Sequence, residues 1–143
     1  AYTDWLSKRD KVQYRLPNEQ EWEYAARNGG DNNLYPWGDE WETSRAVVEQ
    51  TIPKAVNSIS SGANKWGVVD LIGNVWEWTS SELAAYPNSK YEPTKTTKKE
   101  YVIRGGSSQS KASGDSAVTS TTRLWVEAGR QDPLLGFRIA RSD

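Results

Sequence analysis

Two carboxylates flank a turn near the middle of the chain, and their spacing allows both to contact one ligand. Asp70 lies seven residues before Glu77, and Gly73 between them lets the backbone turn. An aspartate and a glutamate placed in this way can converge on one hard cation, with backbone carbonyls completing an oxygen shell of the calcium type. The spacing is not that of an EF-hand loop. The residues alone favour another reading, in which Glu77 pairs with a buried arginine such as Arg104 or Arg138.

The segment 73–79, Gly-Asn-Val-Trp-Glu-Trp-Thr, is predicted to be a strand. Side chains alternate between the two faces of a strand, so Trp76 and Trp78 share one face while Glu77 lies on the other. Two indole rings on one face bury a large apolar area. We therefore expect the tryptophan face to anchor the core.

The elements that must position this strand can be read from local signals. Asn18 followed by Glu21 forms a capping box, which predicts a helix over residues 19–28. The end of another helix is predicted over residues 3–9, and a further strand over 101–104. A closing strand at 136–140 would complete a small antiparallel sheet. Its inward-facing side chains are expected to be Phe137 and Ile139.

Residues 107–135 show neither helical nor strand periodicity, and nine of the seventeen residues from 107 to 123 are serine or threonine. A loop of this length within a small domain is usually functional or disordered. Trp125 is the strongest candidate for a ligand contact, because buried aromatics dominate binding energies. The alternative, that Trp125 caps the core from beneath the loop, is equally well supported. The full set of candidate ligand-binding residues is Ser108, Ser110, Asp115, Arg123, Trp125 and Arg130.

Four blocks, in order, resemble the formylglycine-generating-enzyme (sulfatase-modifying factor) family, a variant of the C-type lectin fold. They are residues 14–27, 35–40 and 66–79, and the pair 102–107 with 136–138. The resemblance implies an α+β, C-type lectin-like domain with a small antiparallel sheet, two helices and long irregular loops. It spans residues 1–143 as a single domain corresponding to the C-terminal majority of the family's domain. Because the chain has no methionine, we expect it to be a piece whose N-terminal part is missing.

The resemblance also implies one calcium site and favours it over the arginine pairing. Carried over by position, the calcium ligands are the side chains of Asp70 and Glu77 and the carbonyls of Gly73 and Val75. A second calcium site of the family requires a side-chain oxygen where this chain has Val47, so that site is expected to be lost.

The catalytic groups of the family are not carried over. Its copper-dependent oxidases use two cysteines at positions that match Ser110 and Asp115, and a related branch holds iron with histidines. This chain has no cysteine and no histidine, and a hydroxyl and a carboxylate do not replace two thiolates at a Cu(I) site. Hydrolysis by Ser110 would depend on Lys111 as the nearby base, which is a poor arrangement for activating a hydroxyl. The domain is therefore expected not to be an enzyme.

These observations predict a non-catalytic ligand-binding or sensor domain stabilised by calcium. The resemblance suggests that it belongs to a larger bacterial protein such as a serine/threonine kinase. The alternatives are a variable ligand-binding protein of a diversity-generating retroelement, a divergent enzyme of the family, or a domain that only mediates assembly. The expected partner is a protein, peptide or small molecule.

Charge and hydropathy limit the partners further. A net charge of −1 and a pI near 5.6 do not favour nucleic acid, and no apolar run is long enough to span a membrane. By family analogy, an extracytoplasmic or cell-surface location is favoured.

Overall fold

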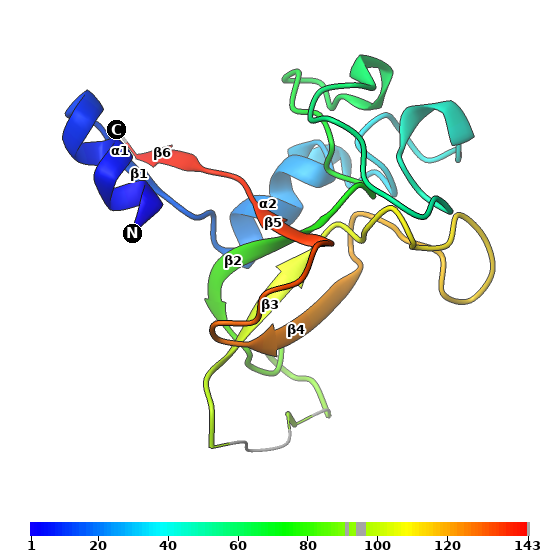
Figure 1. Cartoon of the computed structure of the whole chain (residues 1–143). Coiled ribbons are helices and arrows are strands. Elements are labelled where there is room, and N and C mark those ends of the chain that lie inside the picture. Colours follow the sequence, from blue (N-terminus) through cyan, green and yellow to red (C-terminus); the bar gives the residue numbers. More distant parts are fainter. Residues whose placement is uncertain (91, 94–96, 143) are drawn as a thin grey trace.

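The computed structural model describes residues 1–90, 92–93 and 97–142. Its elements follow the chain from blue to red in Figure 1. The helices are α1 (Tyr2–Asp10) and α2 (Glu19–Ala26), with short 3-10 turns η1 (Gly29–Asp31), η2 (Thr43–Arg45) and η3 (Ser60–Gly62). The strands are β1 (Gln13–Arg15), β2 (Trp76–Glu82), β3 (Glu100–Arg104), β4 (Arg123–Glu127), β5 (Leu135–Phe137) and β6 (Ala140–Ser142). No helix in this described part of the chain combines the length and apolar character needed to cross a bilayer.

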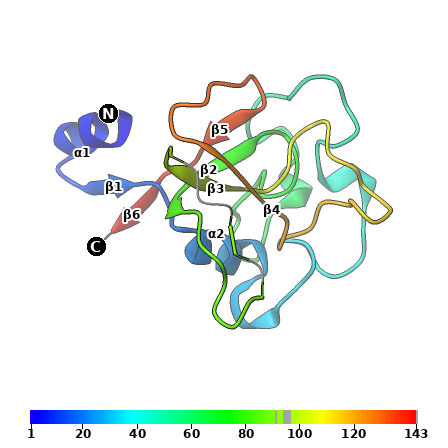
Figure 2. The same cartoon turned by 90° about the horizontal axis from the view of Figure 1, so that it is seen from below.

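The central element is a four-stranded sheet in the order β4-β3-β2-β5. β3 is antiparallel to both β2 and β4, whereas β5 runs parallel to β2, so the sheet is mixed rather than purely antiparallel. The predicted closing strand at 136–140 is divided between β5 and β6. β6 pairs with β1 in a separate two-stranded sheet that lies with α1 to one side of the main sheet (Figures 1 and 2).

The capping box that predicted α2 is present. The Asn18 side chain accepts a hydrogen bond from the Glu21 amide at 2.8 Å, and the Glu21 carboxylate accepts one from the Asn18 amide at 2.9 Å. The helix ends at Ala26, two residues earlier than expected, because Asn28 and Gly29 both have positive φ angles. α2 then packs against β2 and β3 and contributes Trp22, which is 1% exposed.

The alternation expected for β2 is present, but the buried face is the opposite of the predicted one. Glu77 and Thr79 are 5% and 1% exposed, whereas Trp76 and Trp78 are only half-buried. The physical reason is that α2 covers the face that carries Glu77. The two tryptophans lie on the other face of the sheet.

The prediction that Phe137 and Ile139 face inward is also wrong, since they are 50% and 40% exposed. Because β5 pairs in parallel with β2, Phe137 lies in register with Trp78, on the face away from α2. Ile139 lies between β5 and β6, where the chain has left the main sheet.

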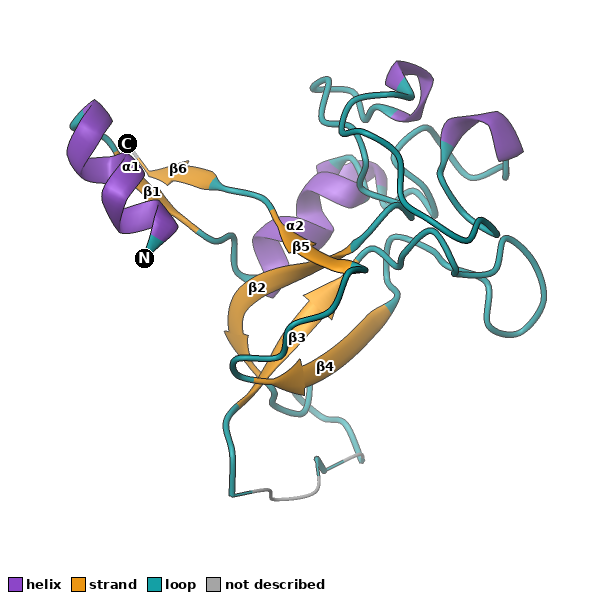
Figure 3. Ribbon diagram, viewed as in Figure 1, coloured by secondary structure: helices purple, strands orange, loops and turns teal. Residues whose placement is uncertain are grey.

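The long connection between α2 and β2 is mostly irregular, as expected, and packs over one end of the sheet (Figure 3). Its buried cluster includes Val48 and Ile72, against which Trp37 and Trp41 pack. Val118, from the segment between β3 and β4, completes this cluster. Ile72, the residue before Gly73, is thereby held in place by apolar contacts.

Candidate functional site

The carboxylate of Glu77 is at the centre of a buried ion pair. Arg138, which follows β5, donates from Nε to Oε2 and from Nη2 to Oε1, both at 2.6 Å. Trp22 of α2 donates its indole N–H to Oε2, also at 2.6 Å. Such two-pronged pairing of arginine with a carboxylate is strong and geometrically specific. Of the two arginines considered as alternatives from the sequence, the structure places Arg138 on Glu77.

The other predicted calcium ligands lie in the turn that leads into β2. Asp70 is partly exposed, has φ 58°, and accepts a hydrogen bond from the Asn57 amide at 2.7 Å. Gly73 has φ 77° and donates its amide to the carbonyl of Gly105 at 2.8 Å. The guanidinium of Arg138 also donates to the carbonyl of Val69 at 3.1 Å, so it connects this turn with Glu77.

The four expected ligands are oxygen donors of the kind that a hard cation takes, but Glu77 is already paired. Glu77 Oε2 already accepts two hydrogen bonds, while Oε1 accepts one and keeps a second acceptor position. No cluster of three or more acidic side chains suited to a metal occurs in the described part of the chain. A calcium ion here would therefore share Glu77 with Arg138 and depend on backbone carbonyls, including those of Gly73 and Val75. Calcium binding stays a prediction.

The two positions that match the family's cysteines do not form a reactive pair. Ser110 closes a tight turn, accepting the Ser107 amide on its hydroxyl at 2.9 Å and donating its own amide to the Ser107 carbonyl at 3.0 Å. Asp115 is exposed in the following turn. Within the described structure, no hydrogen bond or ion pair joins these two side chains.

The structure does not bring the six candidate ligand-binding residues together. Ser108 is fully buried, and its amide donates to the carbonyl of Asn74 at 2.7 Å. Arg123 is held by Glu19, as described below. Trp125, which is 36% exposed, and Arg130 do line one shared depression of about 400 Å³.

Trp125 lies in a strand that the sequence analysis missed. β4 places Trp125 opposite Val102 of β3, within the segment 107–135 that was expected to be loop throughout. The run Leu-Trp-Val at 124–126 is rich in strand-forming residues and could have indicated β4. The surrounding serine and threonine residues obscured this signal.

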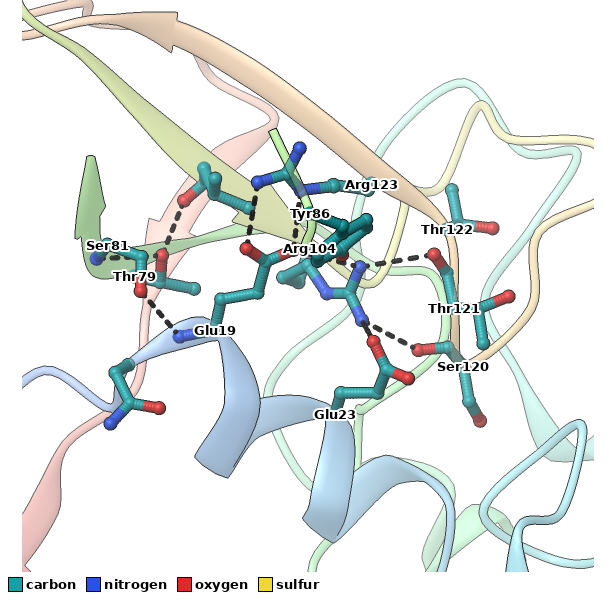
Figure 4. A network of polar contacts seen from close by, with 12 residues as sticks. Glu19, Glu23, Thr79, Ser81, Tyr86, Arg104, Ser120, Thr121, Thr122 and Arg123 are labelled. Carbon is teal, nitrogen blue, oxygen red and sulfur yellow. Dashed lines mark hydrogen bonds and ion pairs between the residues drawn. The ribbon is translucent and has the colours of Figure 1, made fainter. Parts of the chain in front are cut away.

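A second buried polar centre, also missed from the sequence, joins α2 to β3 and β4 (Figure 4). Glu19, 6% exposed, accepts hydrogen bonds from Arg123 at 2.6 and 3.0 Å and from the Tyr86 hydroxyl at 2.6 Å. Burial raises the pKa of Glu19, but the hydrogen bonds from Arg123 and Tyr86 outweigh it and hold that pKa below its usual value. Burial, together with the bond to Glu19, raises the pKa of Tyr86 to about 12.

Arg104 of β3 lies at the base of this centre with no exposed surface. Its guanidinium pairs with Glu23 and lies 3.5 Å from Glu19. It also donates to the carbonyls of Thr121 and Ser120 at 3.1 and 3.3 Å, as the dashed lines in Figure 4 show. One helix and the segment before β4 are thus tied to the sheet by a single arginine.

Comparison with known proteins places this geometry in a family. Residues 1–143 match the family described as "Sulfatase-modifying factor enzyme 1-like domain". The sequence is 34% identical to inactive C-alpha-formylglycine-generating enzyme 2 of Bos taurus, over 98% of this chain and 46% of the relative. It is 36% identical to the formylglycine-generating enzyme of Mycobacterium tuberculosis, over 67% of this chain and 34% of the relative. The chain spans less than half the length of either relative.

Among solved structures, the fold is similar to that of Treponema denticola variable protein 1. The TM-score is 0.72 at 26% identity, with 90% of this chain and 47% of that chain covered. Together with the two helices and small sheets described above, this likeness confirms the predicted α+β, C-type lectin-like fold.

Proposed function

The chain belongs to the sulfatase-modifying factor enzyme 1-like family, and on this premise we propose that it is a non-catalytic member that binds a ligand. The proposal rests on the residues that occupy the two positions where the resemblance expects cysteines. A hydrogen-bonded serine and an exposed aspartate stand there, in a chain without cysteine or histidine. Similarity to an inactive formylglycine-generating enzyme 2 supports the same conclusion.

The proposed ligand surface is the depression shared by Trp125 and Arg130. A half-exposed indole beside a guanidinium offers both apolar area and a directed charge, the combination typical of binding hot spots. Arg130 is braced by an ion pair with Asp132 at 3.0 Å, which limits the freedom that it would lose on binding. The ligand would be a protein, a peptide or a small molecule.

Two contexts fit such a domain. We favour a sensor domain carried by a larger bacterial protein, such as a serine/threonine kinase. The second candidate is a variable ligand-binding protein of a diversity-generating retroelement, and the likeness to Treponema denticola variable protein 1 supports it. In that case the segment 107–135, which contains Trp125, would be the part that differs between copies.

The non-catalytic assignment predicts no turnover of a sulfatase-type cysteine peptide. We expect the purified chain, loaded with copper and incubated with such a peptide under oxygen, to leave the peptide mass unchanged. The serine and aspartate at the two cysteine positions hold copper(I) poorly because it prefers soft thiolates. Mass spectrometry of the peptide checks the result, with an active formylglycine-generating enzyme as the positive control. Detection of a formylglycine product would refute the proposal.

We further propose that one calcium ion binds at the turn before β2, through Asp70, Glu77 and the carbonyls of Gly73 and Val75. Calcium at about 100 times its Kd should stabilise the fold by roughly 2.7 kcal/mol, raising the melting temperature by roughly 10 °C. Differential scanning calorimetry with calcium and with a chelator measures the shift.

Two variants make the calcium test specific. Asp70→Ala should abolish the calcium-dependent shift, whereas Asp115→Ala, which removes an exposed carboxylate elsewhere, should retain it. Each variant is compared with itself with and without calcium, because loss of the Asp70 bond to Asn57 lowers the baseline. If the wild-type melting curve is the same in calcium and in chelator, calcium does not bind, and Glu77 is only the ion-pair partner of Arg138.

A further inference from the structure

The face of the main sheet that points away from α2, called the outer face below, is apolar. Trp78 of β2 is in register with Ile103 of β3 and with Phe137 of β5. Ile103 is in turn in register with Leu124 of β4. An antiparallel sheet with one face in water usually alternates apolar and polar residues, so that the solvated face is polar. The composition of the outer face therefore favours burial against another surface.

The connection between β4 and β5 covers only part of the outer face. Arg130 of that connection and Ile103 line one depression of about 300 Å³, and Ile103 is buried. Elsewhere on this face, Trp78 and Tyr101 line an open depression of about 440 Å³ together with Gly129. The two rings meet edge to face with their centroids 6.4 Å apart. Aromatic surface thus stays uncovered near the middle of the sheet.

Aromatic side chains of α1 extend this surface. The ring of Tyr2 lies 5.7 Å from that of Phe137 and 5.8 Å from that of Trp5, measured between centroids. Leu6 is the buried residue of α1, whereas Tyr2 and Trp5 are 52% and 54% exposed. Five rings, called the ring row below, therefore follow one another from α1 to β3: Trp5, Tyr2, Phe137, Trp78 and Tyr101.

The exposed apolar area of the ring row is sufficient for a small interface. Tyr2, Trp5 and Phe137 are each half-exposed, and an aromatic side chain can bury about 150–250 Å². These three rings alone therefore expose about 300 Å², which is comparable with the largest apolar patch on a typical monomer. A standard interface buries about 800 Å² on each partner, so the ring row would be the core of an interface of modest size.

The two ends of the ring row carry opposite charges. At the α1 end, Lys8 and Lys11 form no ion pair within the described structure, and the other charged side chains of α1 are paired. At the end near Tyr101, Lys98 and Lys99 are paired with glutamates of β4 and β2. Glu100 has no basic partner among the described residues there. One end is thus left basic and the other acidic.

We propose that the ring row is a self-association surface, against which a second copy of the chain packs its own ring row in the opposite direction. The rings carry no charge, so a surface that covers them has to be apolar as well, and a second copy supplies one through a two-fold axis. The antiparallel arrangement also brings Lys8 of each copy close to Glu100 of the other. The proposal does not depend on the ligand surface around Trp125 or on calcium.

Sedimentation equilibrium of the purified chain over a range of concentrations tests the proposal. The apparent mass should rise from 16.1 kDa toward twice that value as the concentration increases. Trp5→Glu should weaken the dimer at least about tenfold, because it places a charge within the apolar contact. Tyr24→Glu, which changes a similarly exposed ring on α2, should leave the dimer unchanged.

The ¹⁵N spectrum of each variant reports whether it is folded. A single-chain mass at every concentration up to millimolar would overturn the proposal and leave the ring row to a different partner. An undiminished dimer in folded Trp5→Glu would overturn it as well.

Charge reversal tests the antiparallel arrangement. Lys8→Glu and Glu100→Lys should each weaken the dimer by about two- to fivefold, the range expected for an exposed ion pair. The double variant should regain the wild-type affinity, because it exchanges the two signs and keeps the pair. A double variant that dimerises no more tightly than the single variants would contradict the arrangement.

Discussion

Replacing Arg104 with glutamine is expected to lower the free energy of unfolding by about 3–5 kcal/mol, a large part of the stability of a domain of this size. Arg104 is fully buried, pairs with Glu23 and Glu19, and holds the carbonyls of Ser120 and Thr121. Glutamine would remove one of the two guanidiniums that contact each carboxylate and the donors that hold two carbonyls. Urea denaturation followed by tryptophan fluorescence measures the change.

The matched control for this prediction is Arg9→Gln. Arg9 also pairs with a carboxylate, Asp10 at 2.5 Å, but its side chain is 55% exposed, and exposed pairs contribute little. The control should lower the free energy of unfolding far less than Arg104→Gln does. Equal losses in the two variants would mean that burial does not decide the role of Arg104 and that the polar centre is not a structural tie.

The regular elements that the sequence predicted well are those set by local signals. Asn18 and Glu21 are three residues apart, and each satisfies a backbone amide of the other at the start of α2, so the sequence alone suffices. β3 was predicted within one residue, because its run of strand-forming residues ends at two glycines. The overall architecture followed from a resemblance that covers nearly the whole chain.

The orientation of β2 could not be predicted locally. Alternation correctly placed Glu77 opposite Trp76 and Trp78, but hydrophobicity indicated the wrong face as buried. Burial of the Glu77 face depends on where α2 packs and on the arrival of Arg138 from a segment 61 residues away. A buried carboxylate is acceptable only with such a partner, and no local pattern reveals which arginine supplies it.

The same limit applies to the candidate site. The sequence identified both arginines that could neutralise Glu77, and the geometry assigns Arg138 to Glu77 and Arg104 to Glu19 and Glu23. The sequence analysis gave Glu19 no role in a site, yet its carboxylate accepts hydrogen bonds from two segments remote in sequence.

Trp22 links the two buried centres physically. Its indole N–H donates to Glu77, while its ring lies 5.4 Å from the Arg104 guanidinium. Trp22 of α2 therefore holds the Glu77–Arg138 ion pair and the polar centre around Arg104 in fixed relation. A change that displaces Trp22 should disturb both polar centres together.

The turn that precedes β2 has no room for a side chain, and Gly73→Ala is expected to lower the free energy of unfolding by more than about 3 kcal/mol. A Cβ at Gly73 would lie 2.2 Å from the carbonyl oxygen of Val47 and 2.9 Å from a methyl of Val48. That oxygen accepts the Asn74 amide at 2.8 Å, so the neighbouring backbone cannot retreat without breaking this bond.

Gly67→Ala separates this clash from the conformational cost of alanine at positive φ. Gly67 has φ 81°, close to the 77° of Gly73, but a Cβ there would meet nothing within 4 Å, so its substitution should cost only about 1–2 kcal/mol. Denaturation midpoints of the two variants measure the difference. Equal midpoints would show that the turn can relax. A turn that relaxed so easily would not hold the carbonyls of Gly73 and Val75 firmly enough to bind a cation, so the calcium proposal would weaken with it.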